Sequence, residues 1–206
     1  MCEIIRQFME LPTTCISDAM KGLNNMDASI KPLKERYKIA GRAFTVKIPA
    51  GENLAVLRAI REAKPGDILV IDAKGDTYRA IAGDFIVGMA KTLELSGIVV
   101  DGVIRDIIGI KELDFPVFCK GTTVAAGNKH EQGQLNVPIS CGGTTIYPGD
   151  LIVGDVDGVV VIPQTRENEI LRKAMDKFVK DQERAERISQ NPDKVREYLD
   201  NLVGNH

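Results

Sequence analysis

The sequence predicts a mixed α/β domain followed by a charged helical arm. Strand-like and helix-like patterns alternate up to about residue 120, which is typical of βαβ units. Three apolar runs punctuated by proline and glycine follow between residues 135 and 163, and they indicate antiparallel strands. From Thr165 to about Ser189 the pattern is helical and rich in charge. A mixed sheet flanked by helices accounts for all three observations.

The chain opens with two predicted helices. The first is amphipathic, with four apolar residues on one side: Ile4, Ile5, Phe8 and Met9. Thr13 or Thr14 is placed to cap the second helix, which runs through Met20. A Gly-bounded alternation at 37–51 then predicts a strand, and the apolar spacing at 52–63 predicts a helix.

The centre of the chain predicts a strand–helix–strand unit. A Pro-Gly turn leads into a buried strand at 68–71, and a helix is expected at 84–96 because a glycine directly after it stops it. A strand at 98–103 completes the unit. A short helix at 106–113 and a strand at 115–121 follow.

The remaining elements divide the chain into two parts. The runs LNVPISCGG, TTIYPGD and LIVGDVDGVVVIP predict antiparallel strands, with Asp157-Gly158 as the turn of the last hairpin. Charged helices at 165–189 and 193–202 end the chain. We therefore expect an α/β domain at 1–165 and a helical arm at 166–206, which packs on the same domain or on a neighbouring subunit.

Composition excludes several classes of protein. The formal net charge is −2, aromatic residues are 5% and tryptophan is absent, so the chain has neither the field nor the stacking surfaces of a nucleic-acid-binding protein. No apolar run approaches the ~18 residues of a membrane span, and acids interrupt the N-terminal region where a signal peptide has its apolar core. We expect a cytoplasmic protein without a membrane partner, and its four cysteines as reduced, buried thiols.

Charged residues stand at both ends of the otherwise apolar segment from Gly83 to Asp106. The predicted helix descends about 20 Å and the following strand climbs about 20 Å, so Arg105 and Asp106 return to the sheet edge at which Asp84 lies. This is the carboxyl edge, where open α/β sheets bind ligands. The helix N-terminus and Arg105 suit a carboxylate or phosphate, and the two acids suit a divalent metal.

The same residues also fit a purely structural role. Asp84 could cap the helix, and Arg105 and Asp106 could form a surface ion pair worth under about 1 kcal/mol. Spacing alone does not decide between these interpretations.

Other polar residues offer weaker candidates for a site. Lys47 and Lys120 lie near apolar strands, but lysines at strand ends extend to solvent, which disfavours a Schiff-base mechanism. His130 lies in a polar loop without further metal ligands, so a solvated side chain is expected. Asp155 and Asp157 are interpreted as turn residues because the other ligands of a calcium loop are missing.

The charged segment belongs to a pattern that resembles the RraA-like family. This family includes the class II 4-hydroxy-4-methyl-2-oxoglutarate (HMG) and 4-carboxy-4-hydroxy-2-oxoadipate (CHA) aldolases and the regulator of ribonuclease E activity A. The aldolases carry an Asp, twenty residues and then Arg-Asp, which Asp84 and Arg105-Asp106 reproduce. The stretches 17–20, 136–143 and 148–163 are also similar to family sequence, so the resemblance covers about residues 13 to 165.

The resemblance implies a ββα swivelling-domain fold that assembles as homotrimers or hexamers, with sites near subunit boundaries. It also implies a metal-dependent carbon–carbon lyase that releases pyruvate from a small 2-oxo acid, with oxaloacetate decarboxylation as a side activity. The family's other known role gives the alternative function, which is a non-catalytic regulator that binds a ribonuclease or another protein partner.

The resemblance assigns roles to five residues. Arg105 grips the carboxylate end of the substrate, and Asp106 binds Mg²⁺ or Mn²⁺. Asp84 acts through a water on the metal. The backbone amides of Asp84, Phe85 and Ile86 complete the pyruvate pocket.

Overall fold

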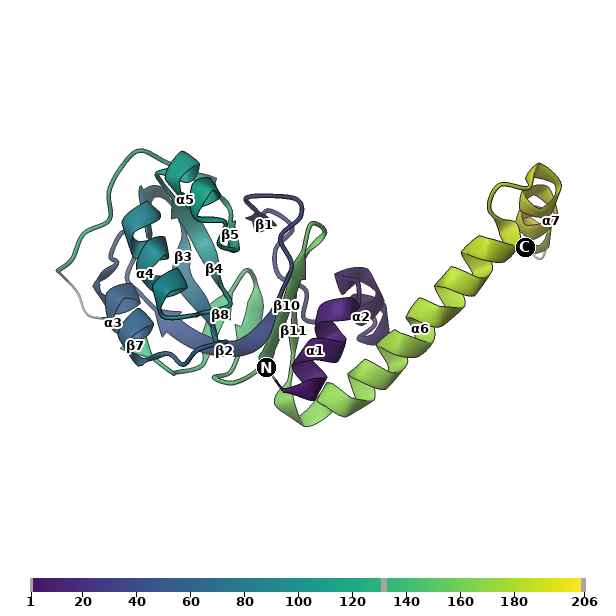
Figure 1. Ribbon diagram of the computed structural model, residues 1–206, viewed down its shortest axis with the longest axis horizontal. Helices are drawn as coiled ribbons and strands as arrows, with labels where there is room; N and C mark the ends of the chain where they lie inside the picture. The colour runs from purple at the N-terminus through teal and green to yellow at the C-terminus, as the bar shows by residue number, and fades with distance from the viewer. Residues whose placement is uncertain (1, 131–132, 205–206) are drawn as a thin grey trace.

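The computed structural model describes residues 2–130 and 133–204 and confirms a mixed α/β fold (Figure 1). The strands are β1 (Lys31–Pro32), β2 (Ile39–Lys47), β3 (Ile68–Ala80), β4 (Gly97–Ile104), β5 (Val117–Cys119), β6 (Gly121–Thr122), β7 (Gln134–Leu135), β8 (Ile139–Cys141), β9 (Thr144–Ile146), β10 (Leu151–Asp155) and β11 (Gly158–Ile162). The helices are α1 (Glu3–Glu10), α2 (Thr13–Ala19), α3 (Leu54–Glu62), α4 (Asp84–Thr92), α5 (Ile107–Leu113), α6 (Glu167–Ile188) and α7 (Pro192–Val203), and a 3-10 turn at Gln164–Arg166 precedes α6.

The main sheet combines parallel and antiparallel strands in the order β1-β5-β4-β3-β2-β10-β11. Strands β2, β3, β4 and β5 are parallel, whereas β10 and β11 pair antiparallel. Every residue of the central strand β4 is buried. A continuous apolar run of this kind is typical of a parallel strand that is covered on both faces.

Side chains that alternate along the strands build a core on each face of the sheet. Helices α3, α4 and α5 cover one face, where Val56, Val87 and Ile110 pack against the strands (Figure 1). The small β8–β9 hairpin packs on the other face, with Cys141 and Ile146 in the core. Helices α1 and α2 and the start of α6 pack against β10 and β11 in a third cluster.

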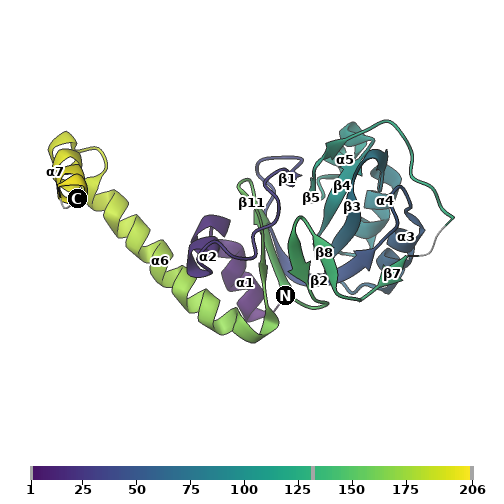
Figure 2. The same cartoon turned by 180° about the vertical axis from the view of Figure 1, so that it is seen from behind.

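The C-terminal helices extend away from this body (Figures 1 and 2). Only the first part of α6 is buried, through Glu167, Ile170, Leu171 and Ala174. Helix α7 has no buried residue and lies at the far end of α6. In the described part of the chain, no helix is long and apolar enough to cross a membrane.

The helix predicted at 84–96 ends earlier, because α4 stops at Thr92. Glu94 has the left-handed conformation (φ 59°), and the N–H of Leu95 donates to the carbonyl of Ala90 at 3.1 Å. With the N–H of Glu94 on the carbonyl of Lys91, these bonds form a Schellman motif. The sequence prediction missed it because a glutamate takes the place that glycine usually holds.

Two smaller predictions were also wrong in detail. No side-chain cap closes the start of α2, because the hydroxyl and N–H of Thr13 donate to the Asp155 carboxylate at 2.6 and 2.9 Å. In the β10–β11 hairpin Asp155 pairs with Gly158, so the two turn residues are Val156 and Asp157 rather than Asp157-Gly158. The buried strand predicted at 68–71 is the first part of the longer β3.

Candidate functional site

All five residues to which sequence analysis assigned a role line one pocket of about 250 Å³. The pocket lies where β3 and β4 end and α4 begins, and the loop after β6 closes its other side. The lining consists of Asn53, Ala80, Ala82, Gly83, Asp84, Phe85, Ile86, Arg105, Asp106, Ala126, Gly127 and Lys129.

Strand pairing, rather than equal element lengths, brings Asp84 and Arg105 together. Helix α4 has nine residues, so it is about 14 Å long instead of the predicted 20 Å. After an irregularity in β3 near Asp76, the chain pairs with β4 again. The N–H of Arg105 donates to the carbonyl of Ala82 at 3.0 Å, which fixes Arg105 directly beside the start of α4.

Asp106 occupies a strained position that a glycine makes room for. It has the left-handed conformation (φ 58°), and its Oδ2 lies 3.3 Å from Nε of Arg105. A Cβ on Gly83 would lie 2.3 Å from that Oδ2 atom. The two side chains are each a little over 40% exposed, at 42% for Arg105 and 44% for Asp106, so a ligand can reach both.

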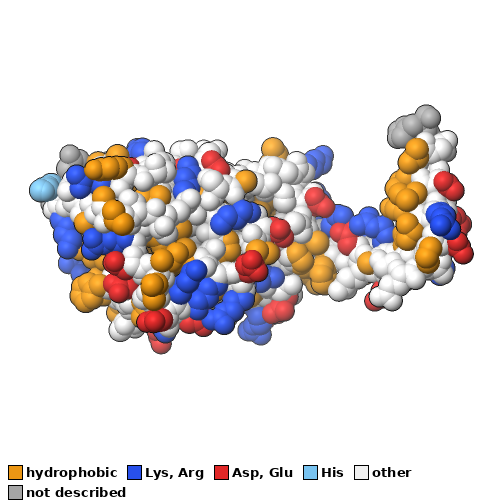
Figure 3. All heavy atoms as spheres, turned by 90° about the horizontal axis from the view of Figure 1, so that it is seen from above, with side chains coloured by type: hydrophobic (Ala, Val, Ile, Leu, Met, Phe, Trp, Pro, Cys, Tyr) orange, Lys and Arg blue, Asp and Glu red, His pale blue; other side chains and the backbone are white. Residues whose placement is uncertain are grey.

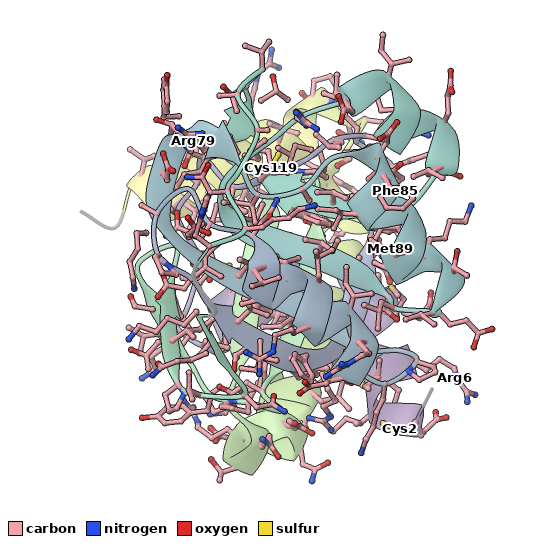
Figure 4. The ribbon with its side chains drawn as sticks, turned by 90° about the vertical axis from the view of Figure 1, so that its left-hand side faces the viewer. Cys2, Arg6, Arg79, Phe85, Met89 and Cys119 are labelled. Carbon is pink, nitrogen blue, oxygen red and sulfur yellow. The ribbon has the colours of Figure 1, made fainter. Side chains whose placement is uncertain are left out.

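Asp84 is the first residue of α4, and Gly83 is the N-cap. Oδ1 of Asp84 accepts the N–H of Phe85 at 2.6 Å. Its Oδ2 faces α5, where a Cβ on Gly109 would lie 2.6 Å away. The Phe85 amide that was assigned to the substrate therefore already has an acceptor. The ring of Phe85 is 77% exposed and points to the outer side of α4 (Figure 4).

Asn53 and Lys129 are pocket residues that sequence analysis missed. Asn53 is only 6% exposed, and its Oδ1 is buried without a hydrogen-bond partner. Backbone hydrogen bonds between Asn53 and Asn128 and between Asn128 and Gly51 hold the two segments together. Polar residues that follow strand β2 are a usable signal for Asn53, whereas the loop that carries Lys129 has no pattern that predicts its position.

The donor set of the pocket fits a hydrated divalent ion. Among the described residues no group of three or more His, Cys, Asp or Glu side chains could hold a metal. Asp84 and Asp106 supply two carboxylates in the pocket. Mg²⁺ is commonly held by one or two carboxylates, with water and substrate oxygens completing its shell. The residues therefore suit a metal that is bound together with a ligand.

The structure gives the weaker candidates other contacts. Nζ of Lys120 lies 2.6 Å from Oδ1 of Asp101, and this bond raises the pKa of Lys120, which opposes a role as a Schiff-base nucleophile. The backbone N–H of His130 donates to the Glu52 carboxylate at 2.7 Å, and the His130 residue is exposed. Neither Lys120 nor His130 lines the pocket.

Comparisons with known proteins identify the family of this chain. A family model described as "RraA-like: Aldolase/RraA" matches residues 13–161. A protein of Halalkalibacterium halodurans, named "Putative 4-hydroxy-4-methyl-2-oxoglutarate aldolase", is 56% identical over 201 residues, which cover 98% of this chain and 96% of that protein.

Two solved structures are similar over most of their length. An uncharacterized protein from Pseudomonas syringae has a TM-score of 0.85 at 27% identity and covers 95% of this chain and 92% of its own. RraAS2 from Streptomyces coelicolor, described as an unusual member of the RNase ES inhibitor RraA protein family, has a TM-score of 0.79 at 32% identity, with coverage of 87% and 94%. Because the family model matches most of its length, this chain belongs to the RraA-like family.

Proposed function

We propose that this protein is a divalent-metal-dependent lyase that cleaves 4-hydroxy-2-oxo acids of the HMG or CHA type to release pyruvate. The observation that carries the proposal is the convergence of Arg105, Asp106 and Asp84 with a helix N-terminus in one small pocket. The name of the 56% identical relative supports the same activity. Oxaloacetate decarboxylation passes through the same pyruvate enolate, so it is the expected side activity.

Arg105 binds the carboxylate next to the keto group. Its guanidinium is part-exposed in the pocket, and the start of α4 adds backbone N–H groups and the positive end of the helix dipole. A pocket of about 250 Å³ is smaller than the ~300–1,000 Å³ of sites for drug-sized ligands, which suits a short acid. Arg105 therefore fixes the pyruvate half of the substrate.

Asp106 would hold the metal, and Asp84 supplies a second carboxylate to the same pocket. A bound Mg²⁺ or Mn²⁺ supplies a Lewis acid for the negative charge that develops on the keto oxygen. The left-handed backbone of Asp106 and the missing side chain of Gly83 aim this carboxylate into the pocket.

Asp84 moves the proton. When the C3–C4 bond breaks, its electron pair forms the enolate, and the C4 hydroxyl must lose a proton to become a carbonyl. The Asp84 carboxylate takes that proton, directly or through a water, and a proton is then returned to C3 to give pyruvate. In oxaloacetate decarboxylation the leaving group is CO₂, so only the return of the proton is needed.

Asn53 and Lys129 face the rest of the substrate. The unpartnered Oδ1 of Asn53 can accept from a hydroxyl, and the exposed Lys129 can pair with a second carboxylate. These residues give the pocket a distal end that distinguishes dicarboxylic substrates from simple keto acids.

The test is pyruvate release from oxaloacetate and from HMG, with Mg²⁺, with Mn²⁺ and with EDTA. Arg105→Ala is compared with wild type and with Arg6→Ala, which removes an exposed arginine outside the pocket. We expect turnover that needs metal and Arg105 but not Arg6. Turnover no greater than that of the metal alone would sink the proposal.

A second candidate function is a regulator that inhibits a ribonuclease by docking. The 32% identity to RraAS2 favours it, because that protein is described as a member of an RNase inhibitor family. A docking surface has no need of a carboxylate-binding arginine beside two acids in a pocket, so the lyase is preferred. Two results together would reverse this preference: the protein releases no pyruvate, and it binds a ribonuclease with an affinity that EDTA does not change.

We also propose that the protein is a homo-oligomer, as a trimer or a hexamer. Phe85 at the pocket and Ile108 on α5 are 77% and 74% exposed. Large apolar side chains exposed next to a site are typical of a surface that another subunit covers. Light scattering coupled to size-exclusion chromatography measures the mass, and a monomer would contradict this assembly.

A further inference from the structure

The loop at residues 123–130 forms the side of the pocket that Ala126, Gly127 and Lys129 line. Lys129 is exposed on this loop, and the proposed function places it beside a second carboxylate of the substrate. The loop contains neither a helix nor a strand. Contacts with other segments must therefore fix the position of Lys129.

Two other segments hold the backbone of this loop. The end of β3 contributes the N–H of Ala80, which donates to the carbonyl of Ala125 at 2.9 Å. In the turn before α3, the N–H of Asn53 donates to the carbonyl of Asn128 at 2.9 Å, and the N–H of Asn128 donates to the carbonyl of Gly51 at 2.7 Å. The loop is therefore fixed to the strand at one point and to the turn at another.

Arg79 contacts all three segments with one side chain. It belongs to β3, and its stem packs over Gly51, where a Cβ would lie 2.7 Å from Cδ of Arg79. Its Nη1 donates to the carbonyl of Ala126 at 3.0 Å and lies 3.5 Å from Oδ1 of Asn128. Arg79 therefore joins the strand, the turn and the loop directly beside Lys129.

The loop packs closely against its supports at Gly127. A Cβ on Gly127 would lie 2.7 Å from the carbonyl oxygen of Ala80 and 3.2 Å from Nδ2 of Asn53. Asn53 is buried and lines the same pocket. A displacement of the loop would therefore change the pocket wall and the position of Lys129 together.

Arg79 acts from outside the pocket. It is not one of the described residues that line the pocket, and Figure 4 shows it far from Phe85 at the start of α4. Lysine and arginine side chains gather at the end of the body that lies away from the arm (Figure 3), and the 123–130 loop lies at this end (Figure 1). Positive charge there favours an acid with two carboxylates over an acid with one.

We infer that Arg79 is a positioning residue, which holds Lys129 where it pairs with the distal carboxylate of a 2-oxo dicarboxylic acid. The inference rests on the proposed function, which gives Lys129 its place at the distal end of the substrate. Without the guanidinium of Arg79, the carbonyl of Ala126 loses its donor and the loop gains alternative positions. Selectivity for the dicarboxylic acid then falls, while the pyruvate end keeps its affinity because Arg105 holds it.

The binding of two acids measures this selectivity without turnover. 2-Oxoglutarate has both carboxylates of HMG but no hydroxyl group, so it does not undergo aldol cleavage, and pyruvate lacks the distal carboxylate. Calorimetric titrations of the full-length protein with Mg²⁺ give the two dissociation constants. We expect the wild type to bind 2-oxoglutarate about 5-fold more tightly than pyruvate, which is the upper end for one exposed ion pair. Arg79→Met keeps a stem over Gly51 and should remove most of this preference without changing the affinity for pyruvate.

A double-mutant cycle separates positioning from a direct effect of the Arg79 charge. Lys129→Met should remove the preference for 2-oxoglutarate, and Arg79→Met should have no further effect in that background. Arg6→Met replaces an exposed arginine outside the pocket and should change neither dissociation constant. An Arg79→Met effect that persists without Lys129 would overturn the inference, and so would an equal loss of affinity for both acids.

Two further measurements separate this inference from the proposed function. Trypsin should cut after Lys129 faster in Arg79→Met than in the wild type and in Arg6→Met, and an unchanged rate would overturn the inference. Pyruvate release is measured on the same proteins. Selective binding that needs Arg79, in a protein without turnover, would remove the lyase reaction and leave the role of Arg79. Turnover in a wild type that binds both acids equally would do the reverse.

Discussion

Gly83 and Asp106 are matched to each other: a Cβ on Gly83 would lie 2.3 Å from Oδ2 of Asp106. Gly83 has φ −124° and ψ −174°, an extended conformation that alanine adopts without strain. The glycine is therefore required by its neighbour and not by its own backbone. Twenty-three residues apart in sequence, the pair decides where the proposed metal ligand points.

We expect Gly83→Ala to lower kcat/KM for pyruvate release by about 100-fold or more, because a displacement of about 1 Å at a reacting centre has that effect. The Asp106 carboxylate must move, while the fold should keep its thermal midpoint. The matched control is Gly88→Ala on α4, where a Cβ would meet nothing nearer than 3.8 Å. A fully active Gly83→Ala enzyme would show that catalysis does not depend on the position of the Asp106 carboxylate.

Gly109→Ala should act on the other carboxylate. Its Cβ would lie 2.6 Å from Oδ2 and 3.0 Å from Cβ of Asp84, so the whole Asp84 side chain must shift. Because only aldol cleavage requires removal of the hydroxyl proton, we expect HMG cleavage to fall at least about 10-fold more than oxaloacetate decarboxylation. Parallel assays of both substrates measure this ratio. Equal losses would argue against Asp84 as the base.

Asp106→Asn should weaken metal binding while the fold persists. Asparagine tolerates the left-handed conformation at φ 58°, whereas another side chain there costs about 1–2 kcal/mol. Even residues that only support a metal ligand change affinity by about 10–100-fold when replaced, so we expect at least that loss for a ligand. Calorimetric titration with Mn²⁺ in the presence of pyruvate measures it. Unchanged affinity would remove Asp106 from the metal site.

Much of the fold followed from local patterns in the sequence. The all-apolar run of β4 and the spacing of apolar residues in α3 identify their elements without tertiary information. The end of α4 could not be predicted from such patterns, because Glu94 adopts a backbone conformation that most residues avoid. The burial of Leu95 stabilises this conformation. Helix ends set by such packing are not visible in composition.

The sequence predicted that three charged residues meet at one site, but the geometric reason given for it was partly wrong. Asp84, Arg105 and Asp106 share a pocket, but the length argument overestimated α4 and missed the second pairing of β3 with β4. Asn53 and Lys129 reach the pocket through contacts between distant loops. No periodicity encodes such contacts, so only the three-dimensional structure reveals them.

The acid side of the stability curve should depend on Asp114. The bond from Lys34, and then that from Arg36, lower the pKa of this carboxyl to about 2. Because the folded pKa lies below the unfolded value, the stabilisation is present above about pH 4 and is lost as pH falls through 2. Carboxyl chemical shifts should show this midpoint, and Lys34→Met should raise it. A midpoint near 4 in the wild type would contradict the pairing.

The four cysteines should divide into one reactive and three protected thiols. The prediction that all four cysteines are buried was wrong for Cys2, which is exposed near the start of the chain, whereas Cys15, Cys119 and Cys141 are buried and free. Burial raises the pKa of the Cys15, Cys119 and Cys141 thiols, and the thiolate is the nucleophile. At pH 8 a maleimide should therefore label one thiol per native chain, and Cys2→Ser should abolish this labelling. In denaturant all four should react, and rapid labelling of a second site in the native protein would show that the core around these residues opens.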